Sequence, residues 1–257
     1  MPHNRLPASS RTALPPDSSP SGQRRSNIFR SVARYWPNVR NAVTTRILAI
    51  ADEVDEALYG DKLDRLDPHI VLSCGDLPFD YLEHIVSRLN VPLLYVPGNH
   101  DPDLSLGDST WSPLSAEPPR RGPEGCINVD GRVVEAAGLR VAGLGGSMRY
   151  KPGPNQYSES QMRWRALRVE MVARLTRGRG RSLAIDVLLT HAPAEGFGGR
   201  EEDVAHRGFA VFNRLIKNLR PRLQVYGHVH PYGVAQPTVR LGATMIVNAV
   251  PHRLIEI

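Results

Sequence analysis

The sequence predicts an α/β protein, and three observations support that prediction. Short apolar runs rich in β-branched residues alternate with stretches in which apolar residues recur at helical spacing. Most of these runs end in an aspartate, asparagine or histidine, as expected where a functional site lies at the carboxyl ends of parallel strands. The chain has 257 residues, of which 41% are hydrophobic, which is enough for one large domain or two small ones.

The apolar runs predict strands at residues 47–51, 70–72, 93–96, 141–144, 187–189, 223–226 and 245–247. Helical spacing predicts helices at residues 58–66, 79–89, 158–176 and 209–219. Between them, residues 125–141 contain two turn signals, Asp130-Gly131 and Ala137-Gly138. These turns between short strands predict a β-meander that supplies a second sheet.

The third predicted helix is unusually basic, because residues 161–181 contain seven arginines and a single acid, Glu170. Its larger apolar residues recur at helical spacing, and we expect them to face the core: Trp164, Leu167, Met171 and Leu175. The arginines are then expected to form a solvated face rather than a nucleic-acid patch.

Residues 1–44 differ from the rest of the chain because they are rich in Ser, Pro and Arg and poor in acids. Such a segment buries too little apolar surface to offset its chain entropy, so we expect a disordered tail and one domain over residues 45–257. The composition of the tail also fits an organelle transit peptide.

The net charge of +6 belongs to this tail. Residues 1–45 carry seven Arg and one acid, whereas the remainder carries 25 basic and 25 acidic side chains. Nucleic acid is therefore not an expected partner of the domain. The sequence contains no run of eighteen apolar residues, so no membrane span is predicted. The two cysteines, Cys74 and Cys126, lack metal-type spacing and predict free thiols in a reducing compartment, with the cytoplasm expected.

The functional signal lies where the apolar runs end. Five of them end in side chains that can bind a ligand: Asp52, Asp76, Asn99 with His100, His191, and His228 with His230. Carboxylate, amide and imidazole donors without a thiolate favour Mn, Fe, Zn or Co, and argue against a structural zinc site. Their number exceeds what one tetrahedral ion needs, so two ions are expected, which can clamp a phosphoryl group and generate a bridging hydroxide.

The motifs CGD, GNHD, THAP and GHVH occur in the order and spacing of calcineurin-like metallophosphoesterases, which the chain resembles from about residue 47 to its C-terminus. Within that superfamily, the segments GGSMRYKPGPNQY and HRGFAVFNRLI, together with LSCGDLPFDYLEHIVSRLNVPLLYVPGNHD, resemble a group of predicted cytoplasmic phosphoesterases of unassigned substrate. The resemblance implies a four-layer αββα sandwich.

The resemblance also implies a role for each matching position. Asp76 would bridge two divalent ions, most simply Mn²⁺; one ion would be completed by Asn99, His191 and His228, the other by Asp52 and His230. His100, with Asp101 beside it, would act on the substrate and protonate the leaving oxygen. The implied activity is hydrolysis of a small-molecule phosphomonoester or phosphodiester by a metal-bridging hydroxide.

The first motif departs from the pattern. The superfamily has Asp-x-His, whereas this chain has Asp52-Glu53-Val54. In an extended backbone Val54 would occupy the ligand position and Glu53 would point away, unless the chain has already turned. Three interpretations follow: a weaker second metal, a substitute ligand such as Asp55, Glu56 or His206, or a single metal in a protein that is not an enzyme. The first two are favoured, because a binding-only relative would not need His100.

Three further residues are candidates for contact with the substrate: Arg149, Asn155 and His206. The first two lie in the Gly-rich segment GGSMRYKPGPNQY, which could present backbone N–H groups and a guanidinium to a phosphate. His206 could equally be a capping or surface histidine. The alternative function is a protein-binding scaffold of metallophosphoesterase fold with little or no activity.

Overall fold

The computed structural model of the chain describes residues 44–103, 122–198, 203–231 and 238–257. The tail predicted at the N-terminus lies outside these residues, except for its last position. Among the described helices, none combines the length and the apolar character that a membrane crossing requires.

One sheet has the strand order β13-β1-β2-β3-β4. Its strands are β1 (Arg46–Ile50), β2 (Ile70–Ser73), β3 (Leu93–Tyr95), β4 (Ile127–Asn128) and β13 (His252–Glu256). The first four are parallel, and β13 pairs antiparallel with β1 at the edge. The connections between them contain the 3₁₀ helix η1 (Glu56–Tyr59) and the helices α2 (Asp61–Leu66) and α3 (Phe79–Leu89).

The other main sheet has the order β11-β12-β10-β9-β6-β5. It contains β5 (Val133–Ala136), β6 (Leu139–Leu144), β9 (Val187–Thr190), β10 (Leu223–Tyr226), β11 (Val239–Leu241) and β12 (Thr244–Asn248). The four central strands are parallel, and both edge strands are antiparallel. Its helices are α4 (Glu159–Leu175) and α5 (Ala210–Leu219), and a small ladder joins β7 (Ser147–Met148) to β8 (Gln156–Tyr157).

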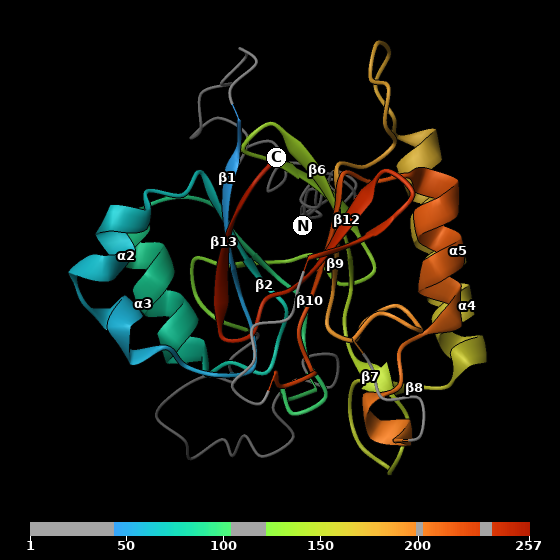
Figure 1. Cartoon of the computed structure of the whole chain (residues 1–257), viewed down its shortest axis with the longest axis horizontal. Coiled ribbons are helices and arrows are strands. Elements are labelled where there is room, and N and C mark those ends of the chain that lie inside the picture. Colours follow the sequence, from blue (N-terminus) through green and yellow to red (C-terminus); the bar gives the residue numbers. More distant parts are fainter. Residues whose placement is uncertain (1–43, 104–121, 199–202, 232–237) are drawn as a thin grey trace, which may run out of the picture. The chain divides into compact units, whose positions relative to one another are not determined.

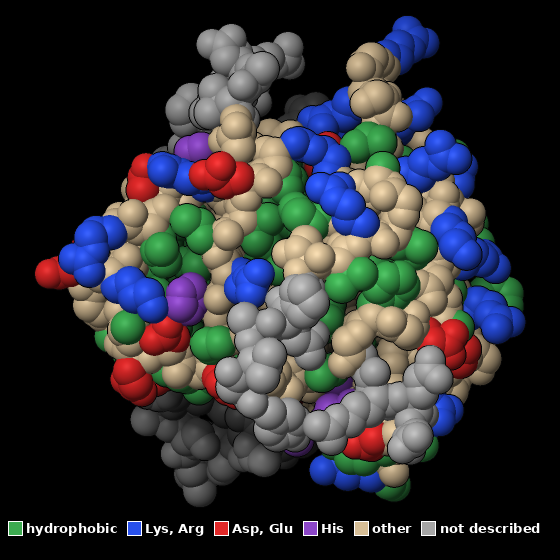
Figure 2. Space-filling model, viewed as in Figure 1, with side chains coloured by type: hydrophobic (Ala, Val, Ile, Leu, Met, Phe, Trp, Pro, Cys, Tyr) green, Lys and Arg blue, Asp and Glu red, His purple; other side chains and the backbone are tan. Residues whose placement is uncertain are grey.

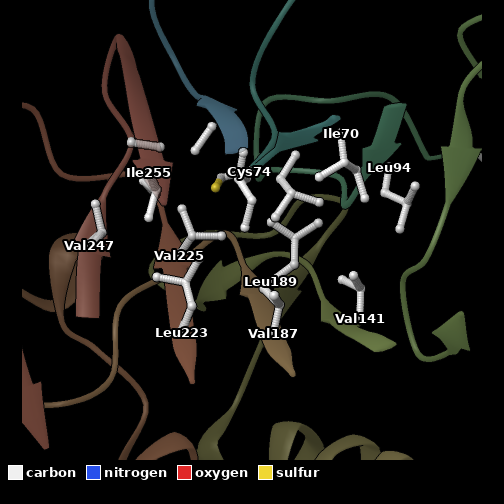
Figure 3. Packing of buried hydrophobic residues seen from close by; sticks show 14 of the residues in the cluster. Ile70, Cys74, Leu94, Val141, Val187, Leu189, Leu223, Val225, Val247 and Ile255 are labelled. Atoms are coloured by element: carbon white, nitrogen blue, oxygen red, sulfur yellow. The ribbon is translucent and has the colours of Figure 1, made fainter. Parts of the chain in front are cut away.

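The two sheets stack face to face, with α2 and α3 outside the first and α4 and α5 outside the second (Figure 1). The alternation of β1 shows why: Ile47 and Ala49 pack between the sheets, whereas Leu48 and Ile50 pack under α2 and α3. Figure 3 shows the layer between the sheets, where Ile70 and Leu94 of the first sheet lie opposite residues of the second such as Val141, Leu189 and Val225. Parallel strands buried on both faces need continuous apolar runs, as the sequence has. The predicted αββα sandwich is therefore confirmed.

The predicted β-meander is divided between the sheets. Strand β4 joins the edge of the first sheet, and only the β5–β6 hairpin, which turns at Ala137-Gly138, belongs to the second. Both turn residues have positive φ, 48° and 78°. The turn signal was thus correct, but the partner of the preceding strand could not be read from it.

The expected core face of the basic helix is wrong. Helix α4 buries Met162, Ala166, Val169 and Ala173, whereas Trp164 is 74% exposed and Leu175 is 81% exposed. Both sets recur at helical spacing, so periodicity alone cannot choose between them. Small alanines allow the α4 backbone to approach the sheet and α5 closely, which the larger residues would prevent. Arg163, Arg168 and Arg174 are exposed as expected, whereas Arg165 is half-buried and pairs with Asp130. Lys and Arg side chains gather along the α4–α5 side of the molecule (Figure 2).

Candidate metal centre

Four side chains from both sheets meet at the carboxyl ends of parallel strands. Their ligand atoms all lie within 4.8 Å of one another, and the four residues are Asp52, Asp76, His191 and His228. Each follows a different strand, namely β1, β2, β9 and β10. Convergence at the carboxyl ends of parallel strands is the expected position of a site in such a fold. We call these four residues the metal group.

Three members of the metal group have a left-handed backbone, which is uncommon for residues other than glycine. The φ angles are 59° at Asp52, 57° at Asp76 and 67° at His228. At Asp52 the amide of Glu53 donates to the Ala51 carbonyl at 2.6 Å, so a γ-turn closes around the aspartate. A left-handed conformation raises the energy of a residue that has a Cβ, and such residues cluster at functional sites.

Two glycines leave room for the carboxylates. A Cβ added at Gly98 would lie 2.0 Å from Asp76 Oδ1 and 2.7 Å from His191 Cε1. A Cβ at Gly227 would lie 2.3 Å from Asp52 Oδ2. Both contacts are far below van der Waals separation, so only a residue without a side chain lets the backbone approach the metal group this closely.

His191 is held by hydrogen bonds at both ring nitrogens. Its Nδ1 donates to the Cys74 carbonyl at 2.7 Å, and its Nε2 faces Asn99 Oδ1 at 2.9 Å and Asp76 Oδ2 at 3.3 Å. Since Nε2 faces two acceptor oxygens, it must carry a proton in the metal-free protein. Burial opposes this charge, but the hydrogen bond and the charge of Asp76 raise the pKa of His191 to about 9. The Nε2 proton of His191 therefore faces the Asn99 and Asp76 oxygens, which a bound metal ion could contact in its place.

His228 has the opposite protonation state. Its Nε2 donates to the Ala205 carbonyl at 2.6 Å, which leaves the lone pair on Nδ1. Burial, followed by the nearby charge of His191, lowers the pKa of His228 to about 3. Its ring lies 4.8 Å from the ring of His191 between centroids. A neutral imidazole with one nitrogen fixed by a backbone carbonyl is the form that binds metals.

The two aspartates of the metal group differ in pKa. Burial raises the pKa of Asp52 to about 6, although its Oδ2 accepts the His228 amide at 2.8 Å. Burial also disfavours the charge of Asp76, but the hydrogen bond and charge of His191 hold the pKa of that carboxyl below its ordinary value. A divalent cation would compensate both buried carboxylates, so the residues present fit a metal site.

The segment after β3 completes the surroundings of Asp76. Asn99 is buried with Oδ1 toward His191, and its Nδ2 donates to the Tyr150 hydroxyl at 3.4 Å. His100 is exposed, and its amide donates to Asp76 Oδ1 at 2.8 Å. Asp101 is buried instead, and its Oδ2 accepts the amides of Gly98 at 2.7 Å and Asp76 at 2.9 Å. The Asp101 carboxylate thus holds the backbone of the loop.

The first-motif segment does not have the geometry expected of an extended strand. Because the chain turns at Asp52, Val54 packs against the apolar cluster under α2 and α3 instead of facing the metal group. Glu53, expected to point away unless the chain had already turned, places Oε1 2.5 Å from His230 Nδ1. His230 itself lies outside the metal group. Sequence reasoning missed Glu53 because side-chain alternation holds only where the backbone is extended.

The three predicted substrate residues have different surroundings. The Arg149 guanidinium donates to the Gln156 carbonyl and to Gln161 Oε1, and Asn155 Nδ2 donates to the Asp101 carbonyl at 3.2 Å. His206 stacks 5.2 Å from His228 between ring centroids, and its Nδ1 lies 2.6 Å from Asp203 Oδ2. Of these three, only His206 contacts a member of the metal group.

A pocket of about 540 Å³ lies at Tyr150, whose hydroxyl accepts from Asn99 Nδ2. It is lined by Arg149, Tyr150, Lys151, Pro152 and Gly153. Lys151 lies over the Tyr150 ring, with Nζ 5.2 Å from the centroid. Sequence reasoning had selected this Gly-rich segment but not Tyr150 or Lys151 within it. The sequence signal that could have identified them is the tyrosine that stands between an arginine and a lysine.

Comparisons with known proteins agree with this architecture. A family model described as metallophosphoesterase, calcineurin superfamily, matches residues 74–253, which is more than half of the chain. A comparison with curated proteins gave no match. One solved structure is similar with a TM-score of 0.55 and 18% identity, covering 83% of this chain and 98% of that chain. The crystal structure of TT1561 from Thermus thermophilus is similar with a TM-score of 0.51 and 19% identity, covering 80% and 89%. At these identities the structures show the fold alone.

Proposed function

Because the chain belongs to the calcineurin superfamily of metallophosphoesterases, we propose that it is a metal-dependent hydrolase of small phosphomonoesters or phosphodiesters. The observation that supports this most strongly is the metal group, in which two carboxylates and two imidazoles from both sheets lie within 4.8 Å of one another. Two divalent ions are proposed, most simply Mn²⁺, since oxygen and imidazole donors suit it. When bound, they would lower the pKa of water and withdraw charge from the phosphoryl oxygens.

The side chains of this site divide into ligands and groups that act on the substrate. We propose Asp52, Asp76, Asn99, His191 and His228 as ligands, of which Asp76 would be shared by the two ions. His100 is exposed beside Asp76 and is assigned the role of general acid to the leaving oxygen. Asp101 is assigned a positioning role, because its carboxylate is engaged by two backbone amides.

The pocket beside Tyr150 is the proposed position of the substrate outside its phosphoryl group. Its two cationic residues, Arg149 and Lys151, favour an anionic substrate. The Tyr150 hydroxyl, which accepts from Asn99 Nδ2, is available to donate to a phosphoryl oxygen.

Replacing His100 with alanine tests this assignment. We expect His100→Ala to lower kcat by roughly 10²–10⁴-fold, the usual contribution of a general acid, with little change in metal content. The assay uses the purified full chain with 4-nitrophenyl phosphate and bis(4-nitrophenyl) phosphate at pH 7–9 with Mn²⁺. His69→Ala is the matched control, because His69 lies at the opposite end of the same sheet, where it accepts the Arg46 amide. Absence of activity in the wild type, or equal activity in His100→Ala, would contradict the proposal.

Metal binding is expected to release protons in a pH-dependent number. At pH 7.5 about one proton per protein should leave, because the raised pKa of His191, about 9, keeps it charged without metal. Below pH 6 Asp52 is protonated without metal, because its pKa is raised to about 6, so metal binding should release a second proton. Above pH 9 neither group carries the proton to be released, so proton release should cease. Calorimetric Mn²⁺ titrations in buffers of different ionisation enthalpy measure this number. Release that does not vary between pH 5 and pH 10 would contradict these protonation states.

A second candidate function is a protein-binding scaffold with a weakened metal site. It is supported by the exposed apolar residues of α4, Trp164, Met171 and Leu175, which are available to a partner. The same phosphatase assay separates the two functions, because a scaffold would show no turnover that depends on His100.

A further inference from the structure

Two tight turns meet beside the metal group, one centred on Asp52 and the other on His228. In each, the amide of the next residue donates to the carbonyl of the residue before: Glu53 to Ala51 at 2.6 Å, and Val229 to Gly227 at 2.8 Å. Asp52 Oδ2 joins the turns by accepting the His228 amide at 2.8 Å. As a result, Glu53 Oε1 lies 2.5 Å from His230 Nδ1.

We propose that Glu53 takes the place of the missing first-motif histidine, so that a second divalent ion binds through Asp52, Glu53 and His230, with Asp76 shared. The inference rests on the proposed metal-dependent function and specifies which residues of this chain hold the second ion. It also assigns Val54 no role at the metal, since that side chain packs under α2 and α3.

The donors of this second site differ from those of the corresponding site in the superfamily, where the first motif supplies a histidine. A carboxylate in place of a neutral imidazole adds one negative charge and one hard oxygen donor. Such a set favours a hard ion such as Mn²⁺ more strongly than a set with two imidazoles does. The site around Asn99, His191 and His228 keeps its imidazole character, so the two sites are expected to differ in metal preference.

None of the other residues that could substitute for the histidine has a described contact with His230. Asp55 accepts the Ala57 amide at 2.9 Å and pairs with Lys62 at 3.0 Å and with His252 at 2.8 Å. His206 pairs with Asp203 through Nδ1. Glu56 is an exposed residue in the first turn of η1. Among the described acidic residues, Glu53 is the one whose carboxylate contacts His230.

The contact between Glu53 and His230 has little structural value by itself. The two side chains are 49% and 40% exposed, and exposed ion pairs of this kind contribute little to stability. A variant of Glu53 is therefore expected to fold, which allows metal binding to be measured separately from stability. The exposure also predicts that the second ion exchanges more readily than the first.

The test is the Mn²⁺ stoichiometry of the full chain after chelator treatment, measured by calorimetry and by mass spectrometry of metal content. We expect two ions in the wild type and one in Glu53→Gln, with the affinity of the second site weakened by at least about 10-fold and that of the first unchanged. Glu53→His should retain the second ion and shift its preference toward Zn²⁺. Paramagnetic resonance should show a coupled Mn²⁺ pair in the wild type and an isolated ion in Glu53→Gln.

Glu56→Gln is the matched control, because it removes an exposed carboxylate three positions away that makes no described contact with His230, and it should bind two ions. His230→Gln provides a second test from the other side of the pair and should lose the same ion as Glu53→Gln. Fewer than two ions in the wild type, or two ions of unchanged affinity in Glu53→Gln, would overturn the inference. These measurements need no substrate, so a failed phosphatase assay would overturn the proposed function without affecting them.

Discussion

Replacing Asp76 with asparagine is expected to reduce the proposed phosphoesterase activity by at least about 10³-fold, since it removes the charge that the two proposed ions would share. Asn has nearly the same shape, so the fold should persist. Its amide, however, cannot accept from both the His100 amide, now 2.8 Å from Oδ1, and protonated His191 Nε2, 3.3 Å from Oδ2. Turnover and Mn²⁺ content of the same preparation measure the effect.

The same variant should also change His191. Burial lowers the pKa of His191, and Asp76 makes the largest contribution to raising it, so in Asp76→Asn that pKa should fall from about 9. Titration of the imidazole by NMR in the metal-free protein measures this shift. Asp80→Asn, an exposed aspartate in the first turn of α3, is the control and should change neither quantity. Full activity in Asp76→Asn would contradict the assignment of Asp76 to the site.

Adding one methyl group at Gly98 is expected to lower both metal affinity and activity by at least about 10-fold, because changes to the residues around metal ligands alone cost roughly 10–100-fold. The new Cβ would lie 2.0 Å from Asp76 Oδ1, which is held in place by the His100 amide. It would also lie 2.7 Å from His191 Cε1, so Asp76 cannot move away without displacing the histidine. Mn²⁺ affinity and kcat/KM of Gly98→Ala measure the result.

Gly178→Ala is the control for this variant. A Cβ at Gly178 would meet no atom within 4 Å, so that substitution should leave metal affinity, turnover and melting temperature as they are. If Gly98→Ala bound Mn²⁺ like the wild type, Asp76 would have to be more mobile than its hydrogen bonds indicate.

The strand ends were the most predictable part of the molecule. Buried parallel strands require unbroken apolar runs, so the positions after them, where Asp52, Asp76 and His191 lie, could be recognised from the runs alone. Helix α3 has the predicted bounds because its apolar spacing ends at Leu89, followed by Asn90 in the left-handed conformation that closes a helix.

Other features depend on information that side-chain pattern does not contain. The carbonyls of Cys74 and Ala205 fix which nitrogen of His191 and His228 faces the metal group, and any residue type supplies a carbonyl. The contact of Glu53 with His230 depends on one positive φ angle at Asp52. In α4 the choice of buried face depended on how closely the helix approaches its neighbours, which is a property of the assembled layers.

The left-handed backbone at Asp52, Asp76 and His228 has a consequence for engineering. Glycine adopts these angles without strain, and asparagine adopts them more readily than most residues, so both substitutions are expected to relax the metal-free protein. A library selected for thermal resistance alone would therefore drift toward Gly or Asn at these positions and discard the proposed ligands. Stabilisation of this protein should hold the three positions fixed and seek its gains in the outer layers.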